Sequence, residues 1–344
     1  GFVGPPQGGL PRRKGGEKGV RGRSPNWFLE FTARQHRPAA IAPQLTVGRR
    51  AGIARPMGEP HSLHPAQALM ARETVWRRGT VPPDLDGIPV AGGGFAITGD
   101  AFLLRTESDH AYLYRRGEGV IIERPEDADP NEEMLWFNGS VYAAIASLNG
   151  LMPIHASAIA HEGRVHAFTG PSGAGKSTLA AGLGQHGLPL FADDTLLLDL
   201  SEPDRVLCLP GHKRLKLTGE ALELTGSVPE EEVGAETGKH YASPPAGHLR
   251  EVLPLARLSV LAEGAVCQFE PLGAGERIAL LGDDHYTADL FALARGLDRS
   301  ARFTLFAGLA ARIPMERFTR PRDPARFMEG IAAMSRRIAE DSLP

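Results

Sequence analysis

A glycine-rich stretch, GPSGAGKS at residues 170–177, matches the pattern G-x-x-x-x-G-K-[ST] at every fixed position. Glycines in such a loop let the backbone wrap with its N–H groups pointing inward at phosphate oxygens. The Lys176 ammonium would reach the β and γ phosphates, and the Ser177 hydroxyl would bind Mg²⁺. The pattern predicts a nucleotide-binding loop formed by Gly170, Pro171, Ser172, Gly173, Ala174, Gly175, Lys176, Ser177 and Thr178.

The sequence on both sides of this loop agrees with that prediction. VHAFT, residues 165–169, is typical of a strand, and an amphipathic helix is expected from about Ser177 to Gln185, with Gly187 as its stop. The helix would add the positive end of its dipole to the phosphate site. A chance glycine turn before a helix is the alternative. The loop alone implies neither hydrolysis nor transfer.

Three acids follow in LPLFADDTLLLDL, residues 188–200. Phosphoryl transfer needs groups that hold Mg²⁺ and align the acceptor, and carboxylates supply both. The chain returns from Gly187 towards the phosphate-binding edge and reaches Asp193 directly after the apolar run. Asp199 comes six residues after Asp193, about 20 Å away in an extended strand. We therefore predict that Asp193 and Asp194 belong to the site and that Asp199 is the polar end of a strand.

Two adjacent acids have a chemical use that one acid lacks. One carboxylate suffices to hold Mg²⁺, and a second one crowded against it can keep a raised pKa and accept a proton from an incoming hydroxyl. This arrangement suits phosphoryl transfer to an alcohol. The alternative is a structural turn, because Asp-Asp-Thr is also good turn chemistry.

The stretch IHASAIAHEGRVHAFTGPSGAGKSTLAAGLGQHGLPLFADDTLLL, residues 154–198, resembles the catalytic domain of HPr kinase/phosphorylase and its stand-alone serine kinase relatives. The order of features is the same: a strand with His and small residues, a hairpin, a phosphate loop, a short helix, a glycine turn and Ala-Asp-Asp. The resemblance implies an α/β fold with a P-loop core like that of phosphoenolpyruvate carboxykinase. It also implies ATP and Mg²⁺ as cofactors, and the ability to form homo-oligomers.

The same resemblance implies roles for individual residues. Asp193 would be the general base that activates a serine hydroxyl of a protein or peptide substrate. Asp194 and Ser177 would bind Mg²⁺, and Lys176 would clamp the γ-phosphate. His155 would lie near the γ-phosphate and tune the acid pair.

The chain also departs from the HPr kinase/phosphorylase pattern. Thr178 stands where those enzymes usually have Glu, no PGRN-type segment follows downstream, and the N-terminal part is too short for their regulatory domain. The resemblance therefore identifies neither HPr as the acceptor nor a reverse phosphorylase reaction.

Three regions are expected along the chain. Residues 1–70 are rich in Gly, Pro and Arg and should form a basic arm without regular structure. Residues 71–150 should form a small β-rich subdomain with an antiparallel sheet and a helix over 131–149. Residues 151–340 should form the ATP-binding catalytic domain, with two or three helices over 285–340. The sequence does not begin with Met, and a start at Met57 or Met70 would place most of the arm outside the native protein.

Composition narrows the choice of partners and compartment. Residues 1–60 hold eleven Lys/Arg and three Asp/Glu, whereas the whole chain has a formal net charge of −3. We interpret the basic arm as a solvated tail rather than as a specific nucleic-acid or lipid site. Cys208 and Cys267 have no metal-type spacing, which suits a reducing cytoplasm. No apolar run reaches about 18 residues, so no membrane span is expected.

Two polar segments are weaker candidates for the site. HKRLKL, residues 212–217, would place His212, Arg214 and Lys216 on one face of a strand. Such a face could clamp phosphate or an acidic peptide, but a solvated sheet edge is favoured. Residues 226–248 are predicted to form a long loop, from which Lys239 could fold over the nucleotide.

Three hypotheses for function follow. The first is an ATP- and Mg²⁺-dependent kinase that phosphorylates a hydroxyl, most simply a serine of a protein or peptide. The second is a small-molecule kinase on the same core. The third is a nucleotide-binding regulatory module without transfer activity, in which the acid pair only holds Mg²⁺. The sequence does not identify the acceptor.

Overall fold

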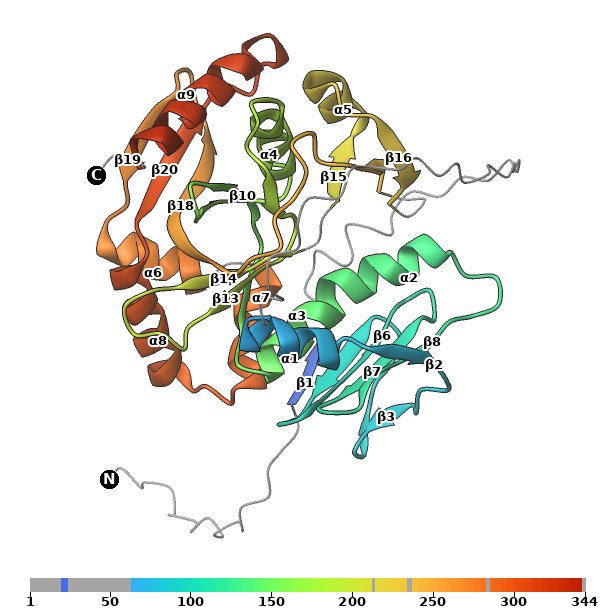
Figure 1. The fold of residues 1–344 in the computed structure, drawn as a ribbon. Coiled ribbons are helices and arrows are strands. Elements are labelled where there is room, and N and C mark those ends of the chain that lie inside the picture. Colours follow the sequence, from blue (N-terminus) through green and yellow to red (C-terminus); the bar gives the residue numbers. More distant parts are fainter. Residues whose placement is uncertain (1–19, 24–62, 212–213, 234–236, 283–284, 342–344) are drawn as a thin grey trace, which may run out of the picture.

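The chain has a mixed α/β fold with several sheets (Figure 1). It is represented by a computed structural model, which describes residues 20–23, 63–211, 214–233, 237–282 and 285–341.

Most of the predicted basic arm lies outside the described residues, but two parts of it have regular structure. Strand β1 (Val20–Arg23) pairs with β5 (Gly94–Ile97). Helix α1 (Pro65–Glu73) buries Ala66 and Met70 in an apolar cluster. The expectation of an arm without regular structure up to residue 70 is therefore wrong for these two segments.

The first sheet has six strands in the order β1-β5-β6-β7-β8-β2. Its remaining strands are β2 (Trp76–Arg78), β6 (Ala101–Arg105), β7 (Ala111–Arg115) and β8 (Gly119–Glu123). Strands β5 to β8 form the predicted antiparallel sheet, because tight turns separate their short apolar runs. Strand β2 joins β8 in parallel. A small hairpin of β3 (Asp84–Leu85) and β4 (Ile88–Pro89) contacts β5 and β6.

One continuous helical region follows, as expected for residues 131–149. It consists of α2 (Pro130–Trp136), a π-helical segment (Phe137–Val141) and α3 (Tyr142–Leu148). Gly150 then ends the helix with φ 84°, a left-handed conformation that glycine adopts without strain.

Helix α3 lies between the first sheet and the second one. Its Ile145 and Leu148 are fully buried and belong to one apolar cluster. That cluster also contains Tyr112 and Tyr114 of the first sheet and Leu197 of the second. The predicted 71–150 and 151–340 regions therefore share a hydrophobic core.

The second sheet has nine strands and carries the candidate site. They are β9 (Met152–Ile154), β10 (Ser157–His161), β11 (Arg164–Thr169), β12 (Leu190–Ala192), β13 (Leu196–Asp199), β14 (Leu207–Leu209), β18 (Leu253–Glu263), β19 (Gln268–Pro271) and β20 (Met315–Arg320). Strand β18 pairs in parallel with both β11 and β20. The carboxyl ends of these three strands therefore lie at the same edge, which is where α/β sheets commonly bind ligands.

Helices cover both faces of this sheet. Helix α4 (Lys176–Gln185) packs with α9 (Phe327–Glu340) through Leu179 and Ile331 on one face. Helices α6 (Ala274–Gly282), α7 (His285–Ala294) and α8 (Arg299–Arg312) pack on the other face (Figure 1). A 3₁₀ turn (Pro324–Arg326) precedes α9. Only helices were predicted for residues 285–340, so strand β20 was not expected from the sequence.

A third sheet, of three strands, lies beside α4. Its order is β15 (Leu215–Thr218), β17 (Lys239–Ala242) and β16 (Pro229–Glu232), and α5 (Gly219–Thr225) follows β15. The prediction of a long loop over residues 226–248 is therefore wrong where β16 and β17 form. Strand β16 is exposed along its whole length, so its sequence shows no apolar alternation.

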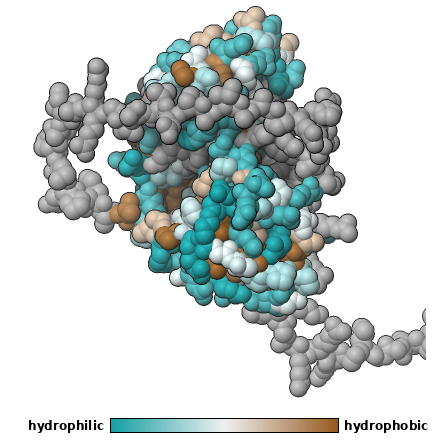
Figure 2. Space-filling model, turned by 90° about the vertical axis from the view of Figure 1, so that its right-hand side faces the viewer, coloured by the Kyte–Doolittle hydropathy of each residue, from teal (hydrophilic) through white to brown (hydrophobic). Residues whose placement is uncertain are grey.

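The face in Figure 2 is mostly hydrophilic, with hydrophobic residues scattered singly or in small groups. Among the described residues, no helix combines the length and apolar character needed to cross a bilayer.

Candidate active site

The predicted phosphate loop joins β11 to α4 at the carboxyl edge of the second sheet. Gly170, Gly173 and Gly175 have φ values of 144°, 76° and 84°, where other residues are strained. A Cβ atom on Gly170 would lie 3.1 Å from the Leu261 carbonyl oxygen. The glycines are therefore required by the backbone path, and α4 begins directly behind the loop, at Lys176.

Lys176 folds back over this loop. Its Nζ donates hydrogen bonds to the carbonyl oxygens of Gly170 at 2.9 Å and Pro171 at 3.3 Å. The side chain is buried. Its ammonium thus lies against the backbone of the loop, and its contact with phosphate stays a prediction.

Asp193 follows β12 and is buried against the loop and its neighbours. Its Oδ1 accepts hydrogen bonds from Ser157 Oγ at 2.6 Å and Ser177 Oγ at 2.8 Å, and its Oδ2 accepts one from the Lys216 backbone N–H at 3.0 Å. Burial raises the pKa of the Asp193 carboxyl, although these donors favour the charged form. Both oxygens are therefore engaged, and one of them meets the first turn of α4.

Asp194 points into different surroundings. Its Oδ2 accepts a hydrogen bond from Lys216 Nζ at 2.8 Å, and its Oδ1 lies 3.7 Å from His155 Nδ1. One third of the side chain is exposed. Burial opposes ionisation, but Lys216 and then His155 outweigh it and hold the pKa of the Asp194 carboxyl well below its ordinary value. Asp194 is thus a partly exposed carboxylate whose charged form is favoured.

His155 lies between β9 and β10, beside the acid pair as predicted. Its Nδ1 lies 2.9 Å from the Asp194 backbone oxygen, and its own carbonyl accepts a hydrogen bond from Thr169 Oγ1 at 3.0 Å. Thr169 is the last residue of β11, so His155 connects the acid pair to the start of the phosphate loop.

The segment HKRLKL divides between the site and the surface. Lys216 in β15 is buried and forms an ion pair with Asp194. The sequence-based preference for a solvated sheet edge is therefore wrong for this residue. Arg214 forms ion pairs with Glu230 and Glu231 instead and stacks over Tyr241. His212 lies outside the described residues.

Lys239 starts β17 and is exposed. Its charge acts on Asp194, but more weakly than those of Lys216 and His155. Its proposed fold over a nucleotide stays a prediction.

Two residues at the site were not predicted from the sequence. Ser157 is a buried donor to Asp193. Arg320, at the end of β20, donates from Nη2 to the Ala174 carbonyl at 3.1 Å. Ser157 could have been noticed as a polar residue within an apolar strand beside His155. Arg320 had no such signal, because its strand was not predicted.

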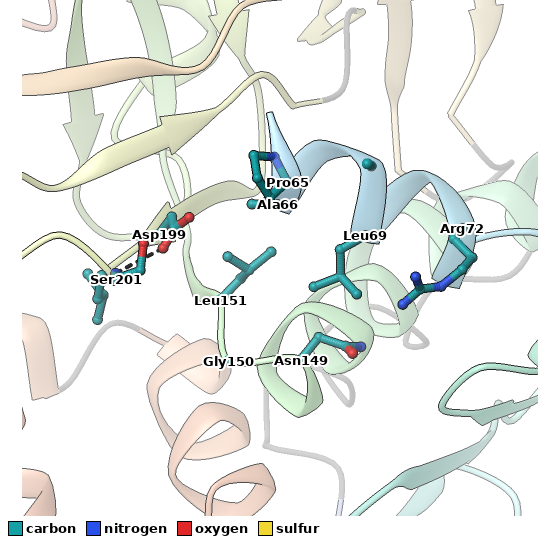
Figure 3. Close-up of a pocket in the computed structure, with 11 residues that line it drawn as sticks. Pro65, Ala66, Leu69, Arg72, Asn149, Gly150, Leu151, Asp199 and Ser201 are labelled. Atoms are coloured by element: carbon teal, nitrogen blue, oxygen red, sulfur yellow. Dashed lines mark hydrogen bonds between the residues drawn. The ribbon is translucent and has the colours of Figure 1, made fainter. Parts of the chain in front are cut away.

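Asp199 ends β13, as predicted, and stands apart from the acid pair. Its Oδ1 accepts a hydrogen bond from the Ser201 backbone N–H at 2.9 Å. It lines a cavity of about 700 Å³ between α1 and the end of α3 (Figure 3). The cavity is also lined by Leu69, Arg72 and Asn149, and it includes none of the predicted site residues.

Comparisons with known proteins find a likeness only among solved structures. No family model matches the chain, and no curated protein matches it. Solved structures that resemble it include the Hpr(Ser) kinase/phosphatase from Coxiella burnetii, with a TM-score of 0.28 and 13% sequence identity. The match covers 55% of this chain and 98% of that one. This is a distant likeness, and it does not identify the function.

Proposed function

We propose that the chain is an ATP- and Mg²⁺-dependent kinase that transfers the γ-phosphate to a hydroxyl, with a serine of a protein or peptide as the acceptor class. The observation that carries the proposal is the hydrogen bond of 2.8 Å between Ser177 and Asp193. It brings together the phosphate-loop hydroxyl and an acid from the neighbouring strand, which are the two protein groups that a P-loop site uses around its metal.

The loop would bind the nucleotide phosphates. Its glycine conformations let the backbone curve around an anion, and the start of α4 adds a positive dipole end. Within the loop, the Ala174 N–H donates to the Pro171 carbonyl at 3.1 Å, so this N–H would have to change partner to reach a phosphate. Lys176 would exchange its contacts with the Gly170 and Pro171 carbonyls for phosphate oxygens.

The residues fit a magnesium ion that binds together with a nucleotide. Mg²⁺ is usually held by one or two carboxylates plus phosphates and waters, and Ser177 and Asp193 would supply the protein oxygens. In the described part of the chain, no group of three or more His, Cys, Asp or Glu side chains could hold a metal by itself. When bound, Mg²⁺ would neutralise charge on the β and γ phosphates.

Asp194 would accept the proton of the attacking hydroxyl. The resemblance implied Asp193 for this role and Asp194 for the metal. Accessibility supports the reverse assignment, although the pKa shifts favour the original one, since the raised pKa belongs to Asp193 and the lowered pKa to Asp194. Asp193 is 1% exposed and both of its oxygens already accept hydrogen bonds, whereas Asp194 is partly open to solvent. Lys216 and His155 would hold the Asp194 carboxylate in place while the hydroxyl aligns.

The test is transfer from γ-labelled ATP in a host lysate, using the full chain with Mg²⁺. Label should enter a discrete polypeptide band. Asp194→Asn should lower transfer by about 10²–10⁴-fold while ATP still binds. Asp199→Asn is the matched control, since it removes the same charge at the end of β13, and it should behave like the wild type.

Two other results would point to a different function. Label in a metabolite alone would indicate a small-molecule kinase. ATP binding with no transfer to any acceptor would indicate a nucleotide-binding module. Full transfer by Asp194→Asn would contradict the role proposed for that residue.

A further inference from the structure

Arg320 is a buried cation for which the described residues provide no acidic partner. It ends β20 and is 7% exposed. Among the described residues, no carboxylate forms an ion pair with it, and its Nε is buried without a hydrogen-bond partner. Burial and then the positive charge of Arg322 lower the pKa of its guanidinium. By contrast, Arg257 in β18 is paired with both Glu316 and Asp341.

The hydrogen bonds of this side chain go to the phosphate loop. Its Nη2 donates to the carbonyl oxygens of Ala174 at 3.1 Å and Gly175 at 3.4 Å. These are the last two carbonyls before Lys176. In a trans peptide group the C=O and the following N–H point in opposite directions. Holding the Ala174 carbonyl on the Arg320 side therefore turns the N–H of Gly175 towards the other side. The Gly175 carbonyl is shared between Arg320 and the Leu179 N–H, which donates to it at 2.9 Å, and together they orient the N–H of Lys176.

Glycines on two elements leave room for the guanidinium and its stem. A Cβ atom on Gly175 would lie 2.6 Å from Arg320 Nη2, and one on Gly330 would lie 3.3 Å from Arg320 Cδ. Gly330 is inside α9, where glycine weakens a helix relative to alanine. The loop and α9 thus each have a glycine at a position where a larger side chain would crowd Arg320.

A buried charge is unfavourable unless an opposite charge balances it. The described protein supplies no acid for Arg320, but the loop it supports is the proposed site of a polyphosphate anion. We propose that Arg320 is a positioning residue for that anion: it orients the last peptide groups of the loop, and the bound phosphate balances its charge. The inference rests on the proposed nucleotide binding and adds a residue to it.

The experiment measures ATP affinity by calorimetry and the thermal midpoint with and without ATP, for the full-length chain. Arg320→Met should weaken ATP binding at least tenfold and lose most of the ATP-dependent rise in midpoint. Arg320→Lys, which keeps the charge, should recover part of both. Without ATP, Arg320→Met should unfold no earlier than Arg317→Met, because it removes an unbalanced buried charge. Arg317 is the matched control, since it lies on the same strand and pairs with Glu270 and Glu276 at the surface.

ATP affinity of Arg320→Met equal to that of the wild type would overturn the inference and leave the proposed function standing. Absence of ATP binding by the wild type would overturn the proposed function and this inference with it. If Arg320→Met does not fold, the comparison of Arg320→Lys and Arg320→Gln decides in the same way, since only the first keeps the charge.

Discussion

At the scale of single residues, the adjacent acids differ because the backbone turns between them. Asp194 has φ 72°, a left-handed conformation that Asp tolerates better than most residues. Strain of this kind is often retained at functional sites. The turn sends Asp193 into the protein towards Ser157 and Ser177, and leaves Asp194 beside Lys216 at the opening. Two identical side chains thus acquire opposite pKa shifts.

Lys216 is expected to hold Asp194 in its working position. Lys216→Met should lower phosphoryl transfer by about 10–100-fold, since a displaced carboxylate no longer aligns the hydroxyl. ATP affinity should change little, because the hydrogen bonds of Lys216 go to the acid pair. Steady-state rates and calorimetric ATP affinity measure the two effects separately.

Arg214→Met is the control for this change, because it removes a cation from the same segment that pairs with surface acids. It should leave transfer near the wild-type rate. Wild-type transfer by Lys216→Met would show that Asp194 needs no such support.

At the scale of elements, structure that depends on neighbouring residues could be predicted from the sequence. Structure that depends on contacts between distant residues could not. The strand–loop–helix unit around residues 164–187 was predicted almost to the residue. Its signals, the glycine spacing and the apolar periodicity, come from residues that are close together in the sequence. Strand β20 was not predicted because it contains Glu316 and Arg320. Both are buried, but charged residues interrupt the apolar pattern by which a core strand is recognised in a sequence. Lys216 was considered and judged solvent-exposed, since its partner Asp194 lies 22 positions away.

A substitution at Gly175 tests whether ATP binding requires the backbone conformation of the phosphate loop. Gly175→Ala should weaken ATP binding at least tenfold, because its Cβ would lie 2.6 Å from Arg320 Nη2 and the residue must keep φ near 84°. Gly187→Ala is the control, since Gly187 has a nearly identical φ of 83° and no atom within 4 Å of an added Cβ. Both variants should lose about 1–2 kcal/mol of stability from the conformation alone.

Calorimetric titration and urea unfolding of both variants separate binding from stability. Equal ATP affinities for Gly175→Ala and Gly187→Ala would mean that the close approach to Arg320 is not required.

At the scale of the whole molecule, the predicted division near residue 150 does not separate two cores. Ile145 is fully buried in the cluster that includes both large sheets. Ile145→Ala should lower the free energy of unfolding by about 2–5 kcal/mol and keep a single transition. Met328→Ala, at a side chain that is 54% exposed, should have little effect.

Two probes can detect a separate N-terminal transition. The three tryptophans are Trp27, Trp76 and Trp136, so their fluorescence reports the N-terminal half, whereas circular dichroism reports the whole fold. Coincident urea transitions are expected. Distinct midpoints for the two signals would mean that the halves unfold independently despite their shared core.

The contact between Arg320 and the phosphate loop also bears on biosynthesis. Arg320 and Ala174 are 146 positions apart, so a ribosome needs roughly 7–30 s after making the loop before it adds its supporting arginine. Contacts of such long range form late, because loop-closure entropy must be overcome first. The nascent chain would therefore carry a recognisable phosphate motif well before it had a finished binding site. A nucleotide that needs the finished loop could stabilise the completed protein but could not guide the earlier stages of its folding.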